Sequence, residues 1–187
     1  MNKVSLLLFV LVLFSLPVRA WDWGVEGGVD LSRFKASKGL MSQDNRVGWF
    51  VGAKFKCEIP MPNLGFDVAL LYNQNRLSYT NKGMEAHKNL HMFVVPLNLR
   101  YDYEVAQSFN VYMATGPQWN WYVGKSDIGG IGKMHHSFFD WNIGAGFEIL
   151  KHVQLGFNYN IPLGKMGELN NVDLEGRTWN FRAAYFF

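Results

Sequence analysis

The sequence predicts an all-β chain, an eight-stranded antiparallel up-and-down transmembrane β-barrel. Apolar and polar residues alternate with a period of two along most of the chain, which indicates strands with one face in an apolar environment. The alternating segments run for about 10–14 residues, whereas a tilted membrane crossing needs ~9–11 and strands of soluble proteins average ~5–6. Short and long connections also alternate between the segments, as they do in transmembrane barrels.

Eight segments carry the alternation, and in each of them apolar residues occupy one face and polar residues or glycines the other. Because lipid cannot hydrogen-bond the backbone, such a sheet must close, with its apolar face outward and its polar face inward. We expect short periplasmic turns, both termini on the periplasmic side, and four longer extracellular loops. Within the expected strands, the alternation is clearest over 23–31, 48–56, 66–73, 93–102, 110–121, 139–149, 153–163 and 179–187. The short turns are expected at 59–63, 105–108 and 151–152, and the long loops at 33–46, 76–89, 124–136 and 165–176.

The composition narrows the class of protein. Of the 187 residues, 49% are hydrophobic, 16% aromatic and 18% charged, a combination that excludes low-complexity disorder. Cys57 is the only cysteine, which excludes a disulfide scaffold and a cysteine-based metal cluster. The formal net charge of +3 includes Lys3 and Arg19, which lie in a segment that we expect to be removed, so we expect no nucleic-acid partner.

Residues 1–20 have the parts of a secretory signal peptide. Lys3 gives a positive start, an apolar run extends from Leu6 to Leu16, and Val18-Arg19-Ala20 offers a cleavage site. The run is shorter than the ~20 apolar residues of a spanning helix. We therefore expect a signal peptide over 1–20, an outer-membrane β-barrel domain over 21–187, and a location in the cell outer membrane of a Gram-negative bacterium.

The interior face of the predicted barrel is rich in charge. Two interpretations are open: a polar conduit, or paired charges that fill a closed barrel. Eight strands enclose a lumen that side chains can fill, which favours paired charges. We expect Glu26 and Arg182 to meet where the first strand closes on the last, and we expect bulges at Pro96, Pro117 and Pro162, because proline cannot donate to a ladder. The predicted interior charges are Glu26, Asp30, Lys54, Lys56, Asp67, Arg100, Asp102, Glu104, Asp140, Glu148 and Arg182.

Several segments, in this order along the chain, resemble the PorT-type outer-membrane β-barrel family of Bacteroidetes. They are Trp23–Ser32, Gly48–Ala53, Val95–Tyr101, Ala114–Pro117, Asp140–Phe147 and the terminal Ala184–Phe187. The resemblance implies a small outer-membrane barrel whose C-terminal strand, ending in Phe187, is read by the outer-membrane assembly machinery. The family is functionally diverse, so the resemblance implies no role in secretion.

The sequence offers one candidate for catalysis, the pair His135 and Ser137, which share an outward face. Some outer-membrane lipid A deacylases use a His-x-Ser pair with a glutamate. Here the glutamate on the same segment, Glu148, lies roughly 36 Å away at 3.3 Å per residue and faces inward. A catalytic triad needs hydrogen-bond contact, so we expect no enzyme and no catalytic, cofactor-binding or metal-ligating residues. A third metal ligand to join His135 and His136 is not evident.

The predicted function is therefore that of a non-enzymatic integral outer-membrane barrel with a packed lumen, which presents surface loops for structural, interaction or adhesion roles. The alternative is a lipid A deacylase-like enzyme that uses His135 and Ser137. Expected partners are outer-membrane lipid and lipopolysaccharide, because basic residues outnumber acidic ones in the first three long loops and suit phosphates. An ordinary solvated loop surface is the other interpretation of these charges.

Overall fold

The computed structural model describes residues 21–35, 46–81, 84–124, 132–134, 136–164, 167–169 and 172–187. These residues form ten strands, and the expected signal peptide lies outside them. The strands are β1 (Trp21–Lys35), β2 (Arg46–Glu58), β3 (Leu64–Asn81), β4 (Met84–Ala106), β5 (Phe109–Tyr122), β6 (Gly132–Met134), β7 (Ser137–Ile149), β8 (Val153–Pro162), β9 (Gly167–Leu169) and β10 (Val172–Phe186).

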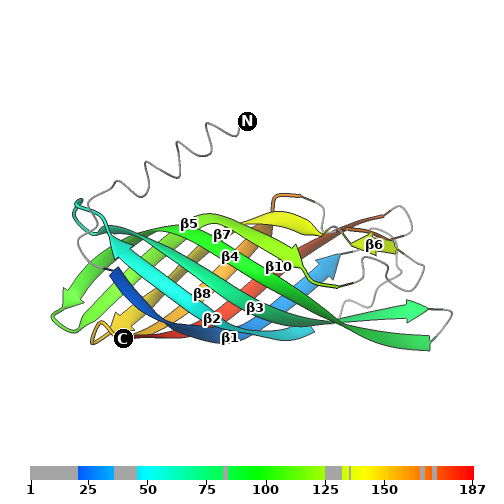
Figure 1. Ribbon diagram of the computed structural model, residues 1–187, viewed down its shortest axis with the longest axis horizontal. Helices are drawn as coiled ribbons and strands as arrows, with labels where there is room; N and C mark the ends of the chain where they lie inside the picture. The colour runs from blue at the N-terminus through cyan, green and yellow to red at the C-terminus, as the bar shows by residue number, and fades with distance from the viewer. Residues whose placement is uncertain are drawn as a thin grey trace.

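Eight of the strands close into an antiparallel barrel, which confirms the predicted fold (Figure 1). Each of β1, β2, β3, β4, β5, β7, β8 and β10 pairs with the next in this order, and β10 pairs back onto β1. The β1–β10 ladder runs without interruption from Gly24 opposite Phe186 to Lys35 opposite Glu175. Closure leaves the barrel no unpaired edge, which is the condition for a sheet in a medium that cannot hydrogen-bond it.

Three tight turns and both ends of the barrel chain lie together at one end, the short-turn end. The turns are residues 59–63, 107–108 and 150–152, close to the predicted positions. Leu150 and Lys151 have φ angles of 54° and 61°, and His152 donates its backbone N–H to the Ile149 carbonyl at 3.2 Å. Positive φ at both central residues is the geometry of a type I′ hairpin turn, whose twist matches that of the flanking strands.

The opposite end, the long-loop end, contains more strand than the sequence predicts. The expected loop at 76–89 is wrong over its described residues, because β3 and β4 continue past the barrel as a paired hairpin as far as Asn81 opposite Met84 (Figure 1). As a result β3 has 18 residues and β4 has 23, beyond the expected strand length. Outside lipid, backbone pairing alone can extend a hairpin, so the loss of alternation does not mark the end of a strand.

The other long loops were also only partly predicted. The segments 124–136 and 165–176 contain β6 and β9, which pair with each other, and β9 also pairs with the start of β10. The first long loop, 33–46, begins and ends in strand, and residues 36–45 lie outside the described residues. The long-loop end therefore carries a small second sheet in addition to the β3–β4 hairpin.

The expected bulges at the prolines are wrong. The register between β4 and β5 is the same at Val95, before Pro96, as at Leu99 after it. Pro117 pairs with Trp141 in an unbroken ladder, and Pro162 ends β8. A proline removes one donor but still occupies one place in its strand, so a bond can be lost without a shift of register. The β4–β5 register shift lies instead between Glu104 and Ala106, at the short-turn end.

The inner face is crowded, and two of its glycines make room for one large ring. The Tyr112 hydroxyl occupies the space that a Cβ atom would need on Gly156, and it lies 2.7 Å from the Cβ position of Gly146. Tyr112 is thereby accommodated inside the barrel, with the Arg100 guanidinium 4.2 Å from its ring centre. The crowding around Tyr112 accounts for glycine at positions 146 and 156.

Candidate functional site

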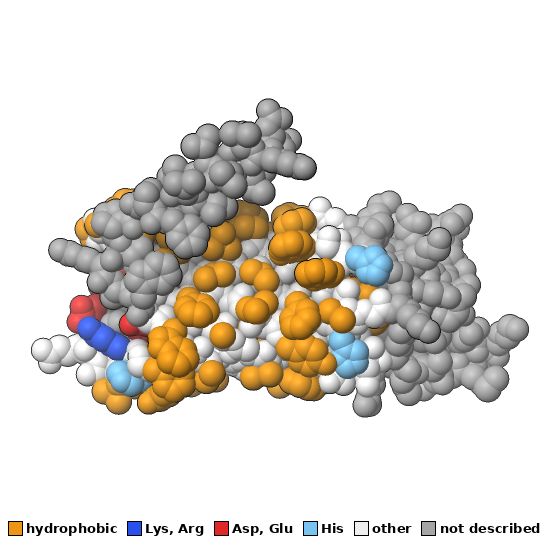
Figure 2. Space-filling model, in the orientation of Figure 1, with side chains coloured by type: hydrophobic (Ala, Val, Ile, Leu, Met, Phe, Trp, Pro, Cys, Tyr) orange, Lys and Arg blue, Asp and Glu red, His pale blue; other side chains and the backbone are white. Residues whose placement is uncertain are grey.

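The outer surface of the barrel is apolar, as predicted from the alternation. On the face seen in Figure 2, hydrophobic side chains cover the flank of the barrel, while Lys, Arg, Asp and Glu side chains appear at the short-turn end. Large hydrophobic side chains from every barrel strand are exposed, with Trp23 at 57% and Met113 at 66% of their full accessible area. A soluble protein rarely exposes so large an apolar area, so this surface fits lipid.

Aromatic side chains gather toward both ends of the apolar surface. At the short-turn end the rings of Trp23 and Phe187 lie 4.6 Å apart. At the long-loop end Trp119 stacks on Trp121 at 6.3 Å and on Phe139 at 6.1 Å. Two aromatic belts of this kind mark the two interfaces of a membrane barrel. No described segment is a helix long and apolar enough to cross a membrane.

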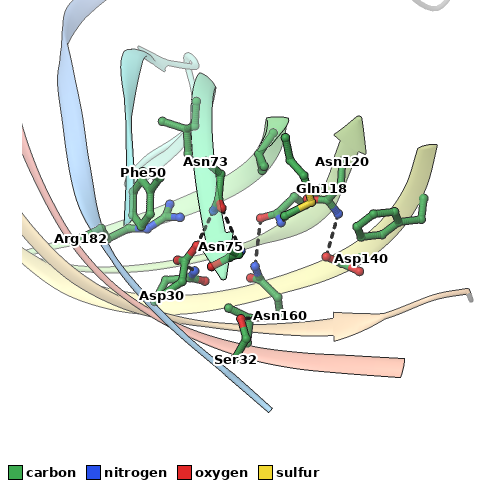
Figure 3. A pocket seen from close by; sticks show the side chains of 16 residues that line it. Asp30, Ser32, Phe50, Asn73, Asn75, Gln118, Asn120, Asp140, Asn160 and Arg182 are labelled. Atoms are coloured by element: carbon green, nitrogen blue, oxygen red, sulfur yellow. Dashed lines mark hydrogen bonds between the residues drawn. The ribbon is translucent and has the colours of Figure 1, made fainter. Parts of the chain in front are cut away.

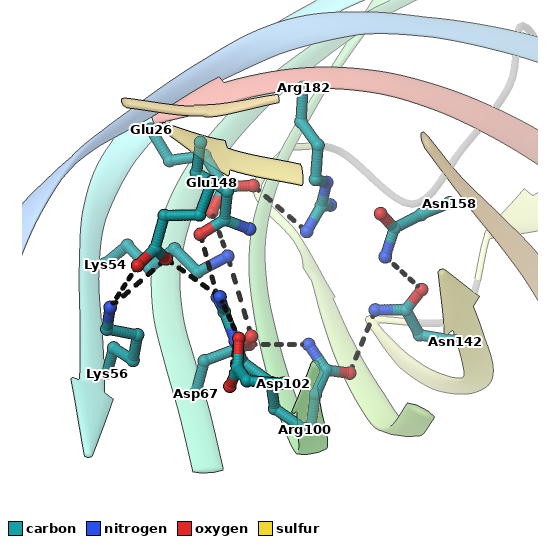
Figure 4. A network of polar contacts seen from close by, with 12 residues as sticks. Glu26, Lys54, Lys56, Asp67, Arg100, Asp102, Asn142, Glu148, Asn158 and Arg182 are labelled. Carbon is teal, nitrogen blue, oxygen red and sulfur yellow. Dashed lines mark hydrogen bonds and ion pairs between the residues drawn. The ribbon is translucent and has the colours of Figure 1, made fainter. Parts of the chain in front are cut away.

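The half of the lumen toward the short-turn end contains a network of ion pairs (Figure 4). Arg100, with no exposed side-chain area, binds Asp102 at 2.6 Å and Glu148 at 2.8 Å. Glu148 also binds Lys56 at 3.0 Å, and Lys56 reaches Asp22 at 3.3 Å. Each buried cation of this group has at least one carboxylate partner, which offsets the cost of removing its charge from water.

The β1–β10 closure carries the pair predicted from the sequence. One carboxylate oxygen of Glu26 forms an ion pair with the Arg182 guanidinium at 3.0 Å, and the other lies 3.2 Å from the Lys54 ammonium. Arg182 stands opposite Gly28 rather than opposite Glu26, so the two partners are offset by two residues along the ladder. Lys54 also lies 3.6 Å from Asp67. The prediction is confirmed, with Lys54 as a third member that the sequence analysis did not assign.

The half of the lumen toward the long-loop end is lined mostly by amides (Figure 3). Asp30 accepts hydrogen bonds from the side-chain amides of Asn73 and Asn180. On the opposite wall, Asn120 donates to Asp140 at 2.7 Å. A cavity of about 30 Å³ lies among these side chains. Asparagine recurs at alternate positions of the polar faces in the sequence, and this recurrence could have predicted an amide-lined region of the lumen.

The predicted interior charges lie in the lumen, with two at its mouth. Asp102 is half-buried and Glu104 is exposed, and both line the opening at the short-turn end. The remaining charges of the predicted set are buried; they are Glu26, Asp30, Lys54, Lys56, Asp67, Arg100, Asp140, Glu148 and Arg182.

Glu148 does not reach Ser137, the described member of the candidate catalytic pair. Ser137 is exposed at the start of β7, opposite Trp121, and His135 lies outside the described residues. Glu148 is buried in the lumen, where Lys56 and Arg100 occupy its carboxylate. No group of three or more His, Cys, Asp or Glu side chains that could hold a metal is present among the described residues.

A closed eight-stranded antiparallel barrel with an apolar outside and a charged inside defines the class of small transmembrane β-barrels. The chain belongs to the family described as outer membrane protein beta-barrel domain, whose family model matches residues 5–187. Family and fold together indicate an outer-membrane protein. No curated protein matches the sequence.

Solved structures with the same fold include two outer-membrane proteins. Neisserial surface protein A is 13% identical, with a TM-score of 0.54, and the match covers 90% of this chain and 100% of that one. The outer membrane protein OprG from Pseudomonas aeruginosa is 12% identical, with a TM-score of 0.52, and the match covers 90% of this chain and 96% of that one. At these identities the likeness concerns the fold alone.

Proposed function

We propose that the protein is a non-enzymatic outer-membrane barrel with a closed lumen, which anchors the strands and loops of its long-loop end at the cell surface for structural, interaction or adhesion roles. The observation that carries the proposal is the buried ion-pair network around Arg100 and Glu26, which occupies the lumen where a conduit would need space. In this arrangement the short-turn end faces the periplasm, since outer-membrane barrels have short periplasmic turns.

The finer assignments belong to the same proposal. Residues 1–20 act as a signal peptide, the chain is a PorT-type member from a Bacteroidetes bacterium, and the strand that ends at Phe187 is read by the assembly machinery. Lipopolysaccharide is the expected lipid neighbour of the long-loop end, because the basic residues of the first three long loops suit its phosphates.

A conductance measurement tests the closed lumen. The purified protein is inserted into planar lipid bilayers and compared with the variant Arg100→Ala, which removes the side chain that bridges Asp102, Glu148 and Gln154. The wild-type protein is expected to show no conductance steps, and the Arg100→Ala protein that inserts into the bilayer is expected to show them. Steady conductance of the wild-type protein at the level of an open pore would overturn the closed lumen.

Trimming the β3–β4 hairpin tests the surface role. Residues 78–87 are replaced by Asn-Gly, so that Leu77 and Lys88, already paired, flank a two-residue turn. A photo-reactive residue is placed on the hairpin of the full-length protein and on the new turn of the trimmed protein. Cross-linking in intact cells is then compared between these two proteins. The trimmed barrel is expected to keep its fold and lose its cross-linked partner. An unchanged cross-linking pattern, or none with either protein, would contradict the role assigned to the hairpin.

The lipid-modifying alternative makes a separate prediction. An enzyme using His135 and Ser137 would lose its product in the variant Ser137→Ala, which mass spectrometry of lipid A would detect. We expect identical lipid A from cells that carry the wild-type protein and the variant. A modification that is present with the wild type and absent with Ser137→Ala would replace the proposed function by the enzymatic one.

A further inference from the structure

In the amide-lined half of the lumen, the side-chain amides form two chains of hydrogen bonds, and each chain ends at a carboxylate (Figure 3). One chain ends at Asp140 and the other at Asp30. On one wall Asn160 donates to Gln118 at 3.2 Å, Gln118 donates to Asn120 at 2.9 Å, and Asn120 donates to Asp140. On the other wall Asn75 donates to Asn73 at 2.9 Å. A carboxylate can only accept, so it orients each neighbouring amide with its NH₂ group toward the carboxylate.

This orientation leaves acceptor oxygens without donors. The Oδ1 atoms of Asp140, Asn160 and Asn180 have no hydrogen-bond partner, although these side chains are only 8%, 4% and 4% exposed. All three side chains line the cavity of about 30 Å³. A buried acceptor without a partner costs free energy, so a hydrogen-bond donor or a cation beside each of these oxygens would stabilise the folded barrel.

The three oxygens come from adjacent strands. Asn160 of β8 pairs with Asn142 of β7 and with Thr178 of β10. Asp140 lies two residues before Asn142, and Asn180 lies two residues after Thr178. Each is therefore a diagonal neighbour of Asn160 on the inner face, at the spacing of ~7–8 Å between diagonal strand positions. Asn160 therefore lies between Asp140 and Asn180 around the barrel, and all three side chains line the same cavity.

The charge balance of the lumen also points to a cation. Five carboxylates are buried, Glu26, Asp30, Asp67, Asp140 and Glu148, against four cations, Lys54, Lys56, Arg100 and Arg182. Each of those cations is held in the ion-pair network of the other half. Arg182 also lines the cavity, on the side of Asp30, but its guanidinium binds Glu26. Neither Asp30 nor Asp140 has an ion-pair partner among the described residues. Asp30 accepts hydrogen bonds from two amides, whereas one oxygen of Asp140 has no partner, so Asp140 is the carboxylate that a bound cation would balance.

We propose that a monovalent alkali-metal cation, Na⁺ or K⁺, binds in this cavity and is ligated by the Oδ1 atoms of Asp140, Asn160 and Asn180. Carboxylate and amide oxygens are the ligands that hard cations prefer. A single positive charge matches the net excess of one carboxylate over the four buried cations. The cavity exceeds the ~10–15 Å³ that one water-sized occupant needs, so a cation and one water fit together.

Cation-dependent stability tests the site. The folded barrel is placed in detergent micelles, and its thermal unfolding midpoint is measured in choline chloride, NaCl, KCl and CaCl₂ at one ionic strength. At ten times the dissociation constant, binding to the folded state alone raises the midpoint by about 3–6 °C for a domain of this size. We expect this increase in NaCl or KCl relative to choline chloride. Equal midpoints in choline, sodium and potassium salts would overturn the proposal, and an increase in CaCl₂ alone would also overturn it.

Two isosteric variants locate the effect. Asp140→Asn removes the unbalanced charge and is expected to abolish the difference between sodium or potassium and choline. Asp67→Asn changes another buried carboxylate, which accepts from Asn98 at 2.7 Å and does not line the cavity, and this variant is expected to keep that difference. A cation effect that survives in Asp140→Asn would refute the assigned ligand. The wild-type comparison decides the proposal even if a variant does not fold.

Discussion

Replacing Glu26 by Gln is expected to lower the free energy of unfolding more than replacing Arg182 by Gln. Glu26 binds two buried cations, so its loss leaves Arg182 without an ion-pair partner among the described residues and leaves Lys54 with Asp67 alone, at 3.6 Å. Removing one partner of a buried ion pair costs ~3–5 kcal/mol. The Arg182→Gln variant still leaves Glu26 with Lys54 at 3.2 Å, so its cost is that of one charged hydrogen bond, ~1.5–3 kcal/mol.

The double variant isolates the interaction across the β1–β10 closure. Once Glu26 is neutral, removal of Arg182 breaks no further ion pair, so the double variant should lose less than the sum of the single losses, by ~0.5–3 kcal/mol. The assay is urea unfolding in detergent micelles, followed by tryptophan fluorescence. The control is Arg177→Gln, an exposed position on β10 where a change within about 0.5 kcal/mol is expected. Additive losses, or a larger loss for Arg182→Gln than for Glu26→Gln, would refute the reasoning.

Three further outcomes are expected. Lys151→Gly should raise the free energy of unfolding by about 0.5–1 kcal/mol, because glycine relieves a φ of 61°, and a loss in the same urea assay would contradict this. Gly52→Ala should lower the free energy of unfolding by ~1–3 kcal/mol, since the new Cβ would lie 2.8 Å from the Leu71 Cα. Gly27→Ala, whose Cβ would lie 3.3 Å from the Phe50 carbonyl oxygen, should lower it less, and equal urea midpoints for the two variants would argue against the crowding. Protease added to intact cells should spare residues 59–63 until the outer membrane is permeabilised, and cutting there in intact cells would mean an inverted orientation.

The alternation of the sequence was sufficient to predict the barrel itself. It assigned the inner and outer faces, the short turns and the Glu26–Arg182 pair, because a period of two fixes which residues share a face and closure fixes which strands meet. It did not predict the β3–β4 hairpin beyond Arg76, since outside lipid no alternation is required and backbone pairing leaves no signal in side-chain polarity. The proline bulges were wrong for a related reason: a lost donor changes hydrogen bonding without changing the register.

The lumen was predicted less completely than the barrel. Parity placed Asn120, Asn160 and Asn180 on the inner face, but the direction of their amide groups depends on which carboxylate each one meets across the barrel. The same holds for Lys54, whose contact with Glu26 follows from the β1–β2 register and from the length of its side chain. These contacts join residues far apart in sequence, and their geometry requires the folded barrel.

Closure of the barrel in the membrane is the central claim, and a cysteine pair across β1 and β10 tests it most directly. Val29 and Phe181 are opposite each other on the outward face of this ladder. In a Cys57→Ser background, Val29→Cys with Phe181→Cys is expected to form a disulfide under mild oxidation in isolated outer membranes, because paired strand positions fall within the Cα range of ~4.4–6.8 Å that a disulfide needs. Val29→Cys with Val111→Cys, on the non-adjacent strand β5, is the matched control and is expected to stay reduced. Failure of the first pair to cross-link, or equal cross-linking of both pairs, would contradict the closed barrel.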